Sequence, residues 1–365
     1  MPVLRLYFDG QSDLRPDFRL SRRSVAILVQ TLHSPADSEA GWSQDLEVLV
    51  YLYWLASATS YRIVGRSFDI PRSTIHDIIH RITNKLLSIK NRIISFPPPD
   101  DLPSIALDFA HRARHAAFSR VVGAIDGCHI RIKPPFKDAI CYYNRKLFYS
   151  IIMQAICDSD CKFLDIFVGY PGSVHDSRVL KNSPMYVQSL YPPEGYVILG
   201  DGGYPCLSEP IGLITPYREP VRNPVERRFN KIHAKARSVI ERAFGILKTR
   251  WRSLFFKALE VQPAFAVKVI ACCAILHNFC LTAGEVLEPE EEDEEEEEGE
   301  GAEQEPEDAA DDQQDGERLR GLMAAALSAP AHQPLALDDH NYGFGAALPA
   351  PVDLPQALDD HDYGY

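Results

Sequence analysis

Four acidic residues stand beside apolar stretches in a pattern that could assemble a metal-binding site. Asp126 ends the apolar run VVGAI, and Asp201 follows the apolar run YVIL in the same manner. A lone buried carboxylate is costly, but two carboxylates at comparable places on two strands can converge on one point of a sheet. Asp176 follows the turn YPGSVH, and Glu241 lies at the border of the apolar face of a long helix. Ligation by carboxylates alone suits the hard cations Mg²⁺ and Mn²⁺ better than Zn²⁺.

Simpler structural roles exist for three of these acids. Asp176 could cap the helix that it opens, and Asp201 could accept a hydrogen bond in a turn before two glycines. Glu241 could be a solvated residue that pairs with Arg237, one helical turn earlier. Such roles explain Asp126 least well, because it interrupts an apolar strand.

The charge of the chain is divided unevenly between its two ends. The formal net charge of −13 by itself argues against a nucleic-acid partner. However, residues 285–365 contain 26 Asp or Glu and only two Arg, so residues 1–284 carry a net charge of +11. Residues 216–257 alone contain 12 Lys or Arg against three Glu, one of which is a candidate metal ligand. We expect Arg237 and Lys248, within this stretch, to contact DNA.

The first hundred residues are expected to be helical, and part of them fits a known kind of DNA reader. A short helix from about Tyr61 to Arg66, a turn at Asp69 and an amphipathic helix from Pro71 fit the helix-turn-helix pattern. The apolar stripe of the second helix leaves polar and basic side chains near its start exposed. The DNA contacts expected among them are Arg72, Ser73, Thr74 and His76. An ordinary helical hairpin would show the same periodicity, and this alternative stays open.

The periodicity changes after the sequence FPPPD at residues 96–100, which stops the helices. Stretches typical of strands follow, and then strands and helices alternate. The expected strands are Val121–Ile132, Phe148–Ser159, Lys162–Tyr170 and Tyr196–Asp201. The expected helices are Asp176–Leu190, Asn230–Leu254 and Pro263–Cys280. This order predicts one mixed α/β sheet covered by helices.

The chain therefore divides into three expected parts. Residues 1–100 form a helical, helix-turn-helix-like region, and residues 101–284 form the α/β domain. Residues 285–365 form an acidic tail whose block of like charges cannot collapse into a core, so we expect it to be disordered. The tail also contains a short duplication, PLALDDHNYG at 334–343 and PQALDDHDYG at 355–364, for which the sequence offers no mechanism.

Several classes of protein are disfavoured by the sequence. No apolar run approaches the ~20 residues that span a bilayer, so no membrane partner is expected. The amino terminus lacks the apolar segment and cleavage site of a secretory signal. The eight cysteines are scattered, which suits reduced thiols in an intracellular protein. Cys273, His277 and Cys280 share one helical face, but without further ligands they fit a helix core better than a zinc site.

Six motifs occur in the order in which they occur in one group of transposases. They are GAIDGCHIRI, NRKLFYSI, VGYPGSVHDSRVL, LGDGGYP, LITPY and SVIERAFGILKTRW. The chain from about Phe18 to Leu281 thereby resembles transposases of the PIF/Harbinger superfamily, and most of all the harbinger transposase-derived nucleases of vertebrates. The resemblance implies an RNase H-like DDE core in which Asp126, Asp201 and Glu241 are the catalytic residues. It also implies that these three bind a divalent metal, with Asp176 either a further ligand or a support for the ligands.

The function that this resemblance implies is an endonuclease, dependent on Mg²⁺ or Mn²⁺, that acts on the phosphodiester bonds of DNA. Two such ions could activate water and stabilise the attacking and leaving oxygens of an in-line displacement. The resemblance also implies a nuclear location, with the cytoplasm as a second one, and a separate Myb-like DNA-binding partner protein. The alternative is a domesticated transposase without catalysis that binds DNA or protein. A phosphohydrolase of small substrates is a third interpretation, but the sequence lacks a phosphate-cradling glycine-rich loop before a helix.

Overall fold

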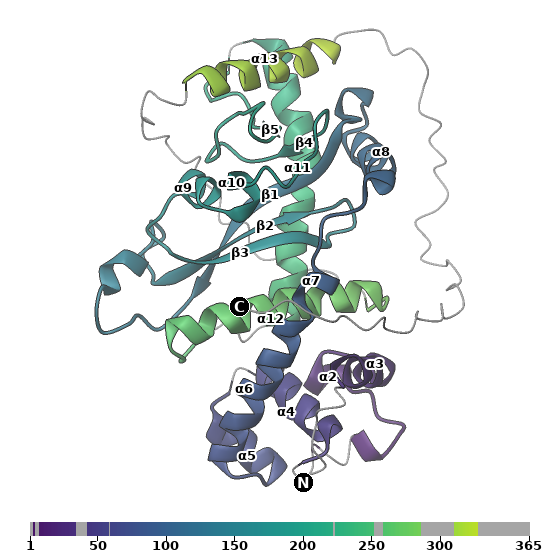
Figure 1. The fold of residues 1–365 in the computed structure, drawn as a ribbon, viewed down its shortest axis with the longest axis vertical. Coiled ribbons are helices and arrows are strands. Elements are labelled where there is room, and N and C mark those ends of the chain that lie inside the picture. The colour runs from purple at the N-terminus through teal and green to yellow at the C-terminus, as the bar shows by residue number, and fades with distance from the viewer. Residues whose placement is uncertain are drawn as a thin grey trace, which may run out of the picture. The chain divides into compact units, whose positions relative to one another are not determined.

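In the computed structural model, the four predicted strands and one further strand form a five-stranded sheet in the order β3-β2-β1-β4-β5 (Figure 1). The strands are β1 (Val121–Arg131), β2 (Ser150–Cys157), β3 (Phe163–Pro171), β4 (Val197–Leu199) and β5 (Leu213–Ile214). β1, β2 and β3 pair antiparallel, whereas β1, β4 and β5 run parallel. Every residue of β2 is buried. Both faces of this strand are covered, as is typical of a strand with a continuous apolar run. The predicted mixed α/β sheet is confirmed.

The structure describes residue 3 and residues 7–33, 42–57, 59–221, 223–251, 258–285 and 310–327. The described residues all belong to one unit by their contacts. Both copies of the duplicated tail motif lie outside the described residues.

Helices cover both faces of the sheet. They are α8 (Leu102–Ala113), α9 (Asp176–Lys181), α10 (Pro184–Val187), α11 (Pro224–Arg250) and α12 (Pro263–Thr282). α11 and α12 lie on one face, and α9 and α10 lie on the other (Figure 1). The side chains of β1 serve both layers because they alternate. Ala124 and Cys128 join the core with α11 and α12, whereas Ile125 joins the core with α9 and α10.

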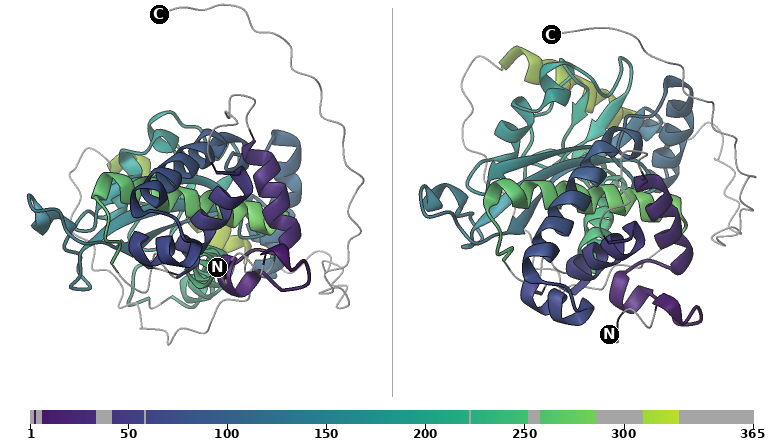
Figure 2. Two further views of the ribbon diagram at one scale, coloured as in Figure 1. Left: turned by 90° about the horizontal axis from the view of Figure 1, so that it is seen from below. Right: turned by 60° about the horizontal axis from the view of Figure 1, so that its bottom comes forward.

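The amino-terminal part of the chain is helical, as predicted. Its helices are α2 (Arg15–Phe18), α3 (Arg22–Leu32), α4 (Gln44–Ser57), α5 (Tyr61–Phe68), α6 (Arg72–Ser88) and α7 (Lys90–Ile93). α6 and α7 pack against α12, which also packs against β3 (Figures 1 and 2). One apolar core therefore continues from the helical region into the sheet. The boundary predicted near residue 100 stays a prediction, since a shared core joins its two sides.

α12 is the central helix of this shared core, and its residues 269–280 are all buried. It is long and apolar enough to cross a membrane, with a mean hydropathy of 1.9, so the expectation that no apolar run has that length is wrong. However, 72% of the apolar window is buried inside the protein, as in a core helix. His277 donates from Nε2 to the carbonyl oxygen of Cys161 at 2.8 Å, and the thiols of Cys273 and Cys280 are buried. The three residues considered for zinc therefore belong to the core.

α5 and α6 form a helix, a turn and a second helix, as predicted. α5 ends where Asp69 adopts a left-handed φ of 56°, and α6 follows Pro71. A Cβ at Gly65 would lie 2.6 Å from the carbonyl oxygen of Ile70, so the close approach of this turn requires glycine. The predicted DNA contacts stand at the start of α6, with Arg72, Ser73 and His76 exposed and Thr74 half-buried. Their contact with DNA stays a prediction.

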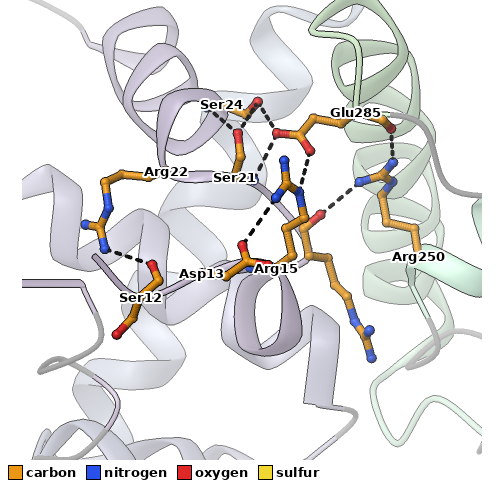
Figure 3. Close-up of polar contacts among 9 residues, drawn as sticks. Ser12, Asp13, Arg15, Ser21, Arg22, Ser24, Arg250 and Glu285 are labelled. Atoms are coloured by element: carbon orange, nitrogen blue, oxygen red, sulfur yellow. Dashed lines mark hydrogen bonds and ion pairs between the residues drawn. The ribbon is translucent and has the colours of Figure 1, made fainter. Parts of the chain in front are cut away.

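Glu285, the first residue of the predicted tail, belongs to the folded body (Figure 3). Its carboxylate accepts hydrogen bonds from the backbone N–H of Ser21 at 3.0 Å, the hydroxyl of Ser24 at 2.6 Å and Nε of Arg15 at 3.0 Å. The buried guanidinium of Arg250, the last residue of α11, donates to the backbone carbonyl oxygen of Glu285. This network fastens the α2–α3 segment to the ends of α11 and α12.

The predicted disorder of residues 285–365 is also wrong for α13 (Ala310–Ala326), which packs against α11 and β5. Gly316 lies so close to Cys206 that a Cβ would collide with the carbonyl oxygen of Cys206. The side chains that α13 turns towards the core are Leu319, Met323 and Ala324, and Leu327 follows them. The average charge of the tail hides this apolar stripe, and burying it stabilises the helix.

Three elements of the sheet domain differ in detail from expectation. The helix expected from Asp176 to Leu190 is divided into α9 and α10, and α10 begins at Pro184, which cannot continue a preceding helix. α11 begins at Pro224, earlier than expected, with Asn223 accepting a hydrogen bond from the N–H of Val225. The two-residue strand β5 was not expected.

Candidate functional site

The sheet places Asp126 of β1 beside the end of β4, and Asp201 lies two residues beyond that end. Leu199 of β4 pairs with Ala124 of β1, and the two strands run parallel. Asp201 and Asp126 each follow two residues after this pair. Paired strands are about 4.8 Å apart, so the predicted convergence of the two acids is supported by the register.

Asp176 approaches β1 at the residue next to Asp126. A Cβ at Gly127 would collide with the Asp176 carboxylate, so only glycine allows this approach. Asp176 is the first residue of α9, and the capping position before it is occupied by His175. Asp176 thus stands one residue after the capping position, and its carboxylate is held beside β1.

Glu241 joins this group through Arg237. Nη1 of Arg237 donates to Oδ2 of Asp126 at 3.1 Å, and Nη2 donates to Oε1 of Glu241 at 2.5 Å. Both α11 residues lie one helical turn apart, and the side chain of Arg237 is 13% exposed, against 49% for Glu241. The predicted pairing of Arg237 with Glu241 is confirmed. The further bond to Asp126 was not predicted, and it brings the helical acid to the strand acids.

The electrostatics of this group favour a bound cation. Burial raises the pKa of Asp126 well above its ordinary value, and the negative charge of Asp201 raises it further. The positive charge of Arg237 opposes this shift, whereas the charge of Asp176 adds to it. A divalent cation relieves such repulsion, and carboxylate oxygens are the donors that Mg²⁺ and Mn²⁺ prefer. The donor set therefore fits such an ion.

The acids are not gathered into a complete set of ligands. Within the described ranges, no three Asp, Glu, His or Cys side chains are arranged so that they could hold a metal ion. Arg237 lies between two of the acids, and Oδ1 of Asp201 accepts a hydrogen bond from the N–H of Gly203 at 3.1 Å. The turn role considered for Asp201 is thereby confirmed, without removing it from the neighbourhood of Asp126.

The basic stretch over residues 216–257 is mixed in its exposure. Its exposed cations are Arg218, Arg227, Arg228, Lys231, Lys235 and Arg242. Lys248 is half-buried, and Arg250 is buried in the Glu285 network. Three further cations of the stretch, Arg222, Arg252 and Lys257, lie outside the described residues. Contact of Arg237 and Lys248 with DNA stays a prediction.

The residues predicted to contact DNA fall into two separate groups. The start of α6 lies beyond α12, on the side away from the sheet (Figure 1). Arg237 and Lys248 lie on α11, which packs directly on β1. The structure therefore joins the α11 group to the acids and leaves the α6 group at a distance from them.

Sequence reasoning missed a polar network at the start of β2. Ser150 is fully buried; its Oγ accepts a hydrogen bond from Nδ2 of Asn144 at 2.9 Å and lies 3.0 Å from Nδ1 of His129. Burial lowers the pKa of His129 to about 4, so its neutral ring can accept a hydrogen bond from the hydroxyl of Ser150. The NRKLFYSI motif contains two of these residues, but nothing in its spacing indicates that they meet.

Residues 125–278 match the family of DDE superfamily endonucleases, and this range contains all four candidate acids. The chain is 27% identical over 263 residues to the Homo sapiens protein named "Putative nuclease HARBI1", which covers 71% of this chain and 74% of that protein. Its Xenopus laevis counterpart is 24% identical over 281 residues, 73% of this chain and 79% of that protein. Protein ALP1-like of Arabidopsis thaliana is 29% identical over 247 residues, 63% of this chain and 59% of that protein. No solved structure matches the chain.

Proposed function

We propose that this chain, which carries a DDE superfamily endonuclease domain over residues 125–278, is a transposase-derived endonuclease that hydrolyses DNA phosphodiester bonds with divalent metal ions. The resemblance to harbinger transposase-derived nucleases is confirmed by the relatives that it matches. The proposal rests on one observation above the others: Asp176 and Asp201 lie near Asp126 of β1, and Arg237 links Glu241 to the same residue.

The acids have distinct roles in this proposal. Asp126, Asp201 and Glu241 would hold the metal, and Asp176 would be a further ligand or would support Asp126 across Gly127. When bound, Mg²⁺ or Mn²⁺ would activate water and stabilise charge on the attacking and leaving oxygens. The raised pKa of Asp126 supports this assignment, because buried acids that repel one another need a cation.

Arg237 has a double role in the same proposal. It neutralises Asp126 and Glu241 through its two terminal nitrogens. A guanidinium can also bind two oxygens of a phosphate, so the cation that pairs the acids is suited to bind the scissile phosphate. The exposed cations of α11 would bind the DNA backbone on either side.

The test is cleavage of duplex DNA by the full chain in the presence of Mg²⁺ or Mn²⁺. We expect wild type to cut and Asp126→Asn to bind DNA without cutting. Asp160→Asn is the matched control, because it makes the same chemical change at an exposed turn residue. Equal cutting by wild type and Asp126→Asn would refute the assignment of Asp126.

A binding factor without catalysis is the second candidate function, and the Arg237 bridge favours it. An arginine that already neutralises two of the acids could keep the site closed to metal. Wild type that binds DNA but does not cut with either metal would support this alternative. Recovery of cutting by Arg237→Gln would then show that the ion pairs of Arg237 keep the metal out of the site.

The proposal also includes the location of the protein in the cell and a protein partner. We place it in the nucleus, with the cytoplasm as a second location, together with a separate Myb-like DNA-binding partner. The support is the resemblance to the harbinger group and the positive charge of residues 1–284. Fractionation of cells that produce the full chain, and co-purification with a Myb-like protein, test these two points.

A further inference from the structure

The connection between β1 and β2, residues 132–149, exposes apolar side chains. Among the described residues, three of the four most exposed large apolar side chains lie in it. Phe136 is fully exposed, Ile140 is 76% exposed and Leu147 is 73% exposed. The segment projects beyond the ends of β1 and β2 (Figures 1 and 2, at the left). Apolar side chains concentrated in one projecting segment indicate an interaction site.

Cations stand between these apolar side chains. The segment contains four exposed cations, Lys133, Lys137, Arg145 and Lys146, against one acid, Asp138. Its charge is complementary to a phosphate backbone. Lysine is depleted from the cores of protein–protein interfaces, so this mixture of residues fits nucleic acid better than a protein partner.

Hydrogen bonds close a turn between Asn144 and Phe148 within the segment. The N–H of Asn144 donates to the carbonyl oxygen of Phe148 at 2.9 Å, and Oδ1 of Asn144 accepts from the N–H of Phe148 at 3.2 Å. Asn144 is buried, and its side chain donates a hydrogen bond to the hydroxyl of Ser150. Within this turn Leu147 has a φ of 61°, a conformation that is costly for a branched side chain. The strained residue is 73% exposed, and strained residues cluster at functional sites.

The segment is also connected to the acid cluster. The N–H of Ser173 donates to the carbonyl oxygen of Cys141 at 3.2 Å, so the segment packs on the turn that leads to Asp176. Arg145 contacts the ring of His175, the residue directly before Asp176. Nucleic acid held by the segment would therefore lie beside the proposed catalytic acids.

We propose that residues 132–149 form a wedge that inserts Phe136 and Leu147 between DNA bases next to the acids, while the lysines and arginine bind the backbone. The inference rests on the proposed function and adds to it that the substrate is DNA distorted by unstacking. Apolar side chains inserted between base steps unstack and kink a duplex, and exposed aromatic rings stack on bases of any sequence.

The test uses the full chain carrying Asp126→Asn and a short duplex with a fluorescent adenine analogue whose emission rises on unstacking. We expect binding to raise the emission. Adding Phe136→Ala and Leu147→Gly should abolish most of the rise and weaken binding about tenfold, since each stacked base contributes this order of affinity. The salt dependence of binding should persist, because the cations that contact phosphates remain.

Three measurements separate a wedge from a structural role. Leu147→Gly removes the strain of a positive φ, so it should not lower the melting temperature. Leu147→Asn, which tolerates the same φ, should lose the emission signal equally. Leu322→Ala, at an exposed leucine of α13, should leave binding and emission unchanged.

Several results would overturn the wedge. Unchanged emission with the double variant would exclude insertion by Phe136 and Leu147. A smaller oligomer for the double variant than for wild type, without a change in DNA binding, would assign the segment to contact between copies. The outcome is separable from the proposed function, because wild type that unstacks DNA but never cuts would refute the nuclease and keep the wedge. Wild type that cuts without unstacking would do the reverse.

Discussion

The acid cluster and the Glu285 network are each built around a carboxylate that is largely removed from solvent, but the two carboxylates are in opposite electrostatic states. Burial and the charges of Asp201 and Asp176 raise the pKa of Asp126 well above its ordinary value, although Arg237 opposes them. Burial also raises the pKa of Glu285, but hydrogen bonds from its partners outweigh burial and lower it from 4.5 to about 2. Asp126 is therefore held close to other negative charges, whereas the carboxylate of Glu285 is stabilised by its hydrogen-bond donors.

This difference separates residues that act from residues that hold the fold together. A group kept in an unfavourable environment by its surroundings is a candidate for chemistry, because binding a cation relieves it. A carboxylate with three donors around it already has its lowest energy in the folded state. Substitutions in the two regions should therefore change different measurable quantities.

The largest expected effect is on catalysis. Asp126→Asn should lower the rate of DNA cleavage by about 10³-fold or more, the loss typical of removing a member of a catalytic group. The free energy of unfolding should change by less than about 1 kcal/mol, because the substitution also removes repulsion with Asp201. Cleavage assays and urea denaturation of the same preparation measure both. A large loss of stability would instead show that Asp126 is a structural residue. The acid cluster and the Glu285 network would then not differ in this respect.

The reverse result is expected at the Glu285 network. Glu285→Gln should lower the free energy of unfolding by about 2–3 kcal/mol, because hydrogen bonds to a charged group are lost. Cleavage per folded molecule should not change. Glu317→Gln is the control, because the Glu317 side chain is 62% exposed, so its ion pair with Arg320 should matter little. Equal effects of the two substitutions would contradict the role given to Glu285.

The effect of Glu285 should also depend on pH in a defined direction. Its pKa is lower in the folded chain than the ordinary 4.5, so the unfolded chain binds the proton first as the pH falls. The stabilisation is complete above pH 4.5 and is lost between pH 4.5 and about 2. Wild type and Glu285→Gln should therefore converge in stability over that window in denaturant titrations. A constant difference across it would show that the charge of Glu285 is not what stabilises.

Two buried histidines should make the free energy of unfolding depend on pH, at pH values above those at which Glu285 has its effect. Burial lowers the pKa of His277 and of His233 from 6.5 to about 4, so both are neutral in the folded chain. The unfolded chain takes up their protons first, so stability should fall as the pH drops from 6.5 to about 4. Each can contribute at most about 1.4 kcal/mol per pH unit. A stability that is flat over this range would mean that the histidines are charged or exposed.

The smallest expected effects concern the docking of α13. Gly316→Ala should cost about 1–3 kcal/mol, because the new methyl group collides with the backbone at Cys206. Gly321→Ala on the same helix meets no atom within 4 Å and should stabilise by about 0.5–1 kcal/mol. Protease sensitivity of α13 and thermal melting compare the pair. Opposite signs are required, and equal signs would mean that α13 does not dock through Gly316.

The sequence predicts those strands and helices whose apolar side chains form a continuous run or recur with the period of a helix. The sequence predicts the strand that contains Asp126 and the strand that ends just before Asp201, because an apolar run precedes each acid. Their matching positions then follow from the parallel pairing of β1 with β4. The helix of Glu241 was found from its apolar face, although its start at Pro224 was placed too late.

What the sequence could not predict depends on contacts between distant residues. Arg237 is 111 residues from Asp126, and no local pattern indicates that they meet. α13 was hidden by the charge of its surroundings, because a net charge averages over the residues that face the core. The role of Gly127 was equally invisible, since it depends on where Asp176 lies after the chain turns back.

The Glu285 network also constrains the order in which the chain can mature on the ribosome. Ser24 and Glu285 are separated by 261 residues, so the α2–α3 segment cannot complete its hydrogen bonds until almost the whole folded body has been synthesised. At about 5–20 residues per second, that interval lasts roughly 13–50 s. During this time the amino-terminal helices must wait with part of their apolar surface uncovered. Nascent chains stalled before residue 285 should therefore depend on chaperones more than chains stalled after it.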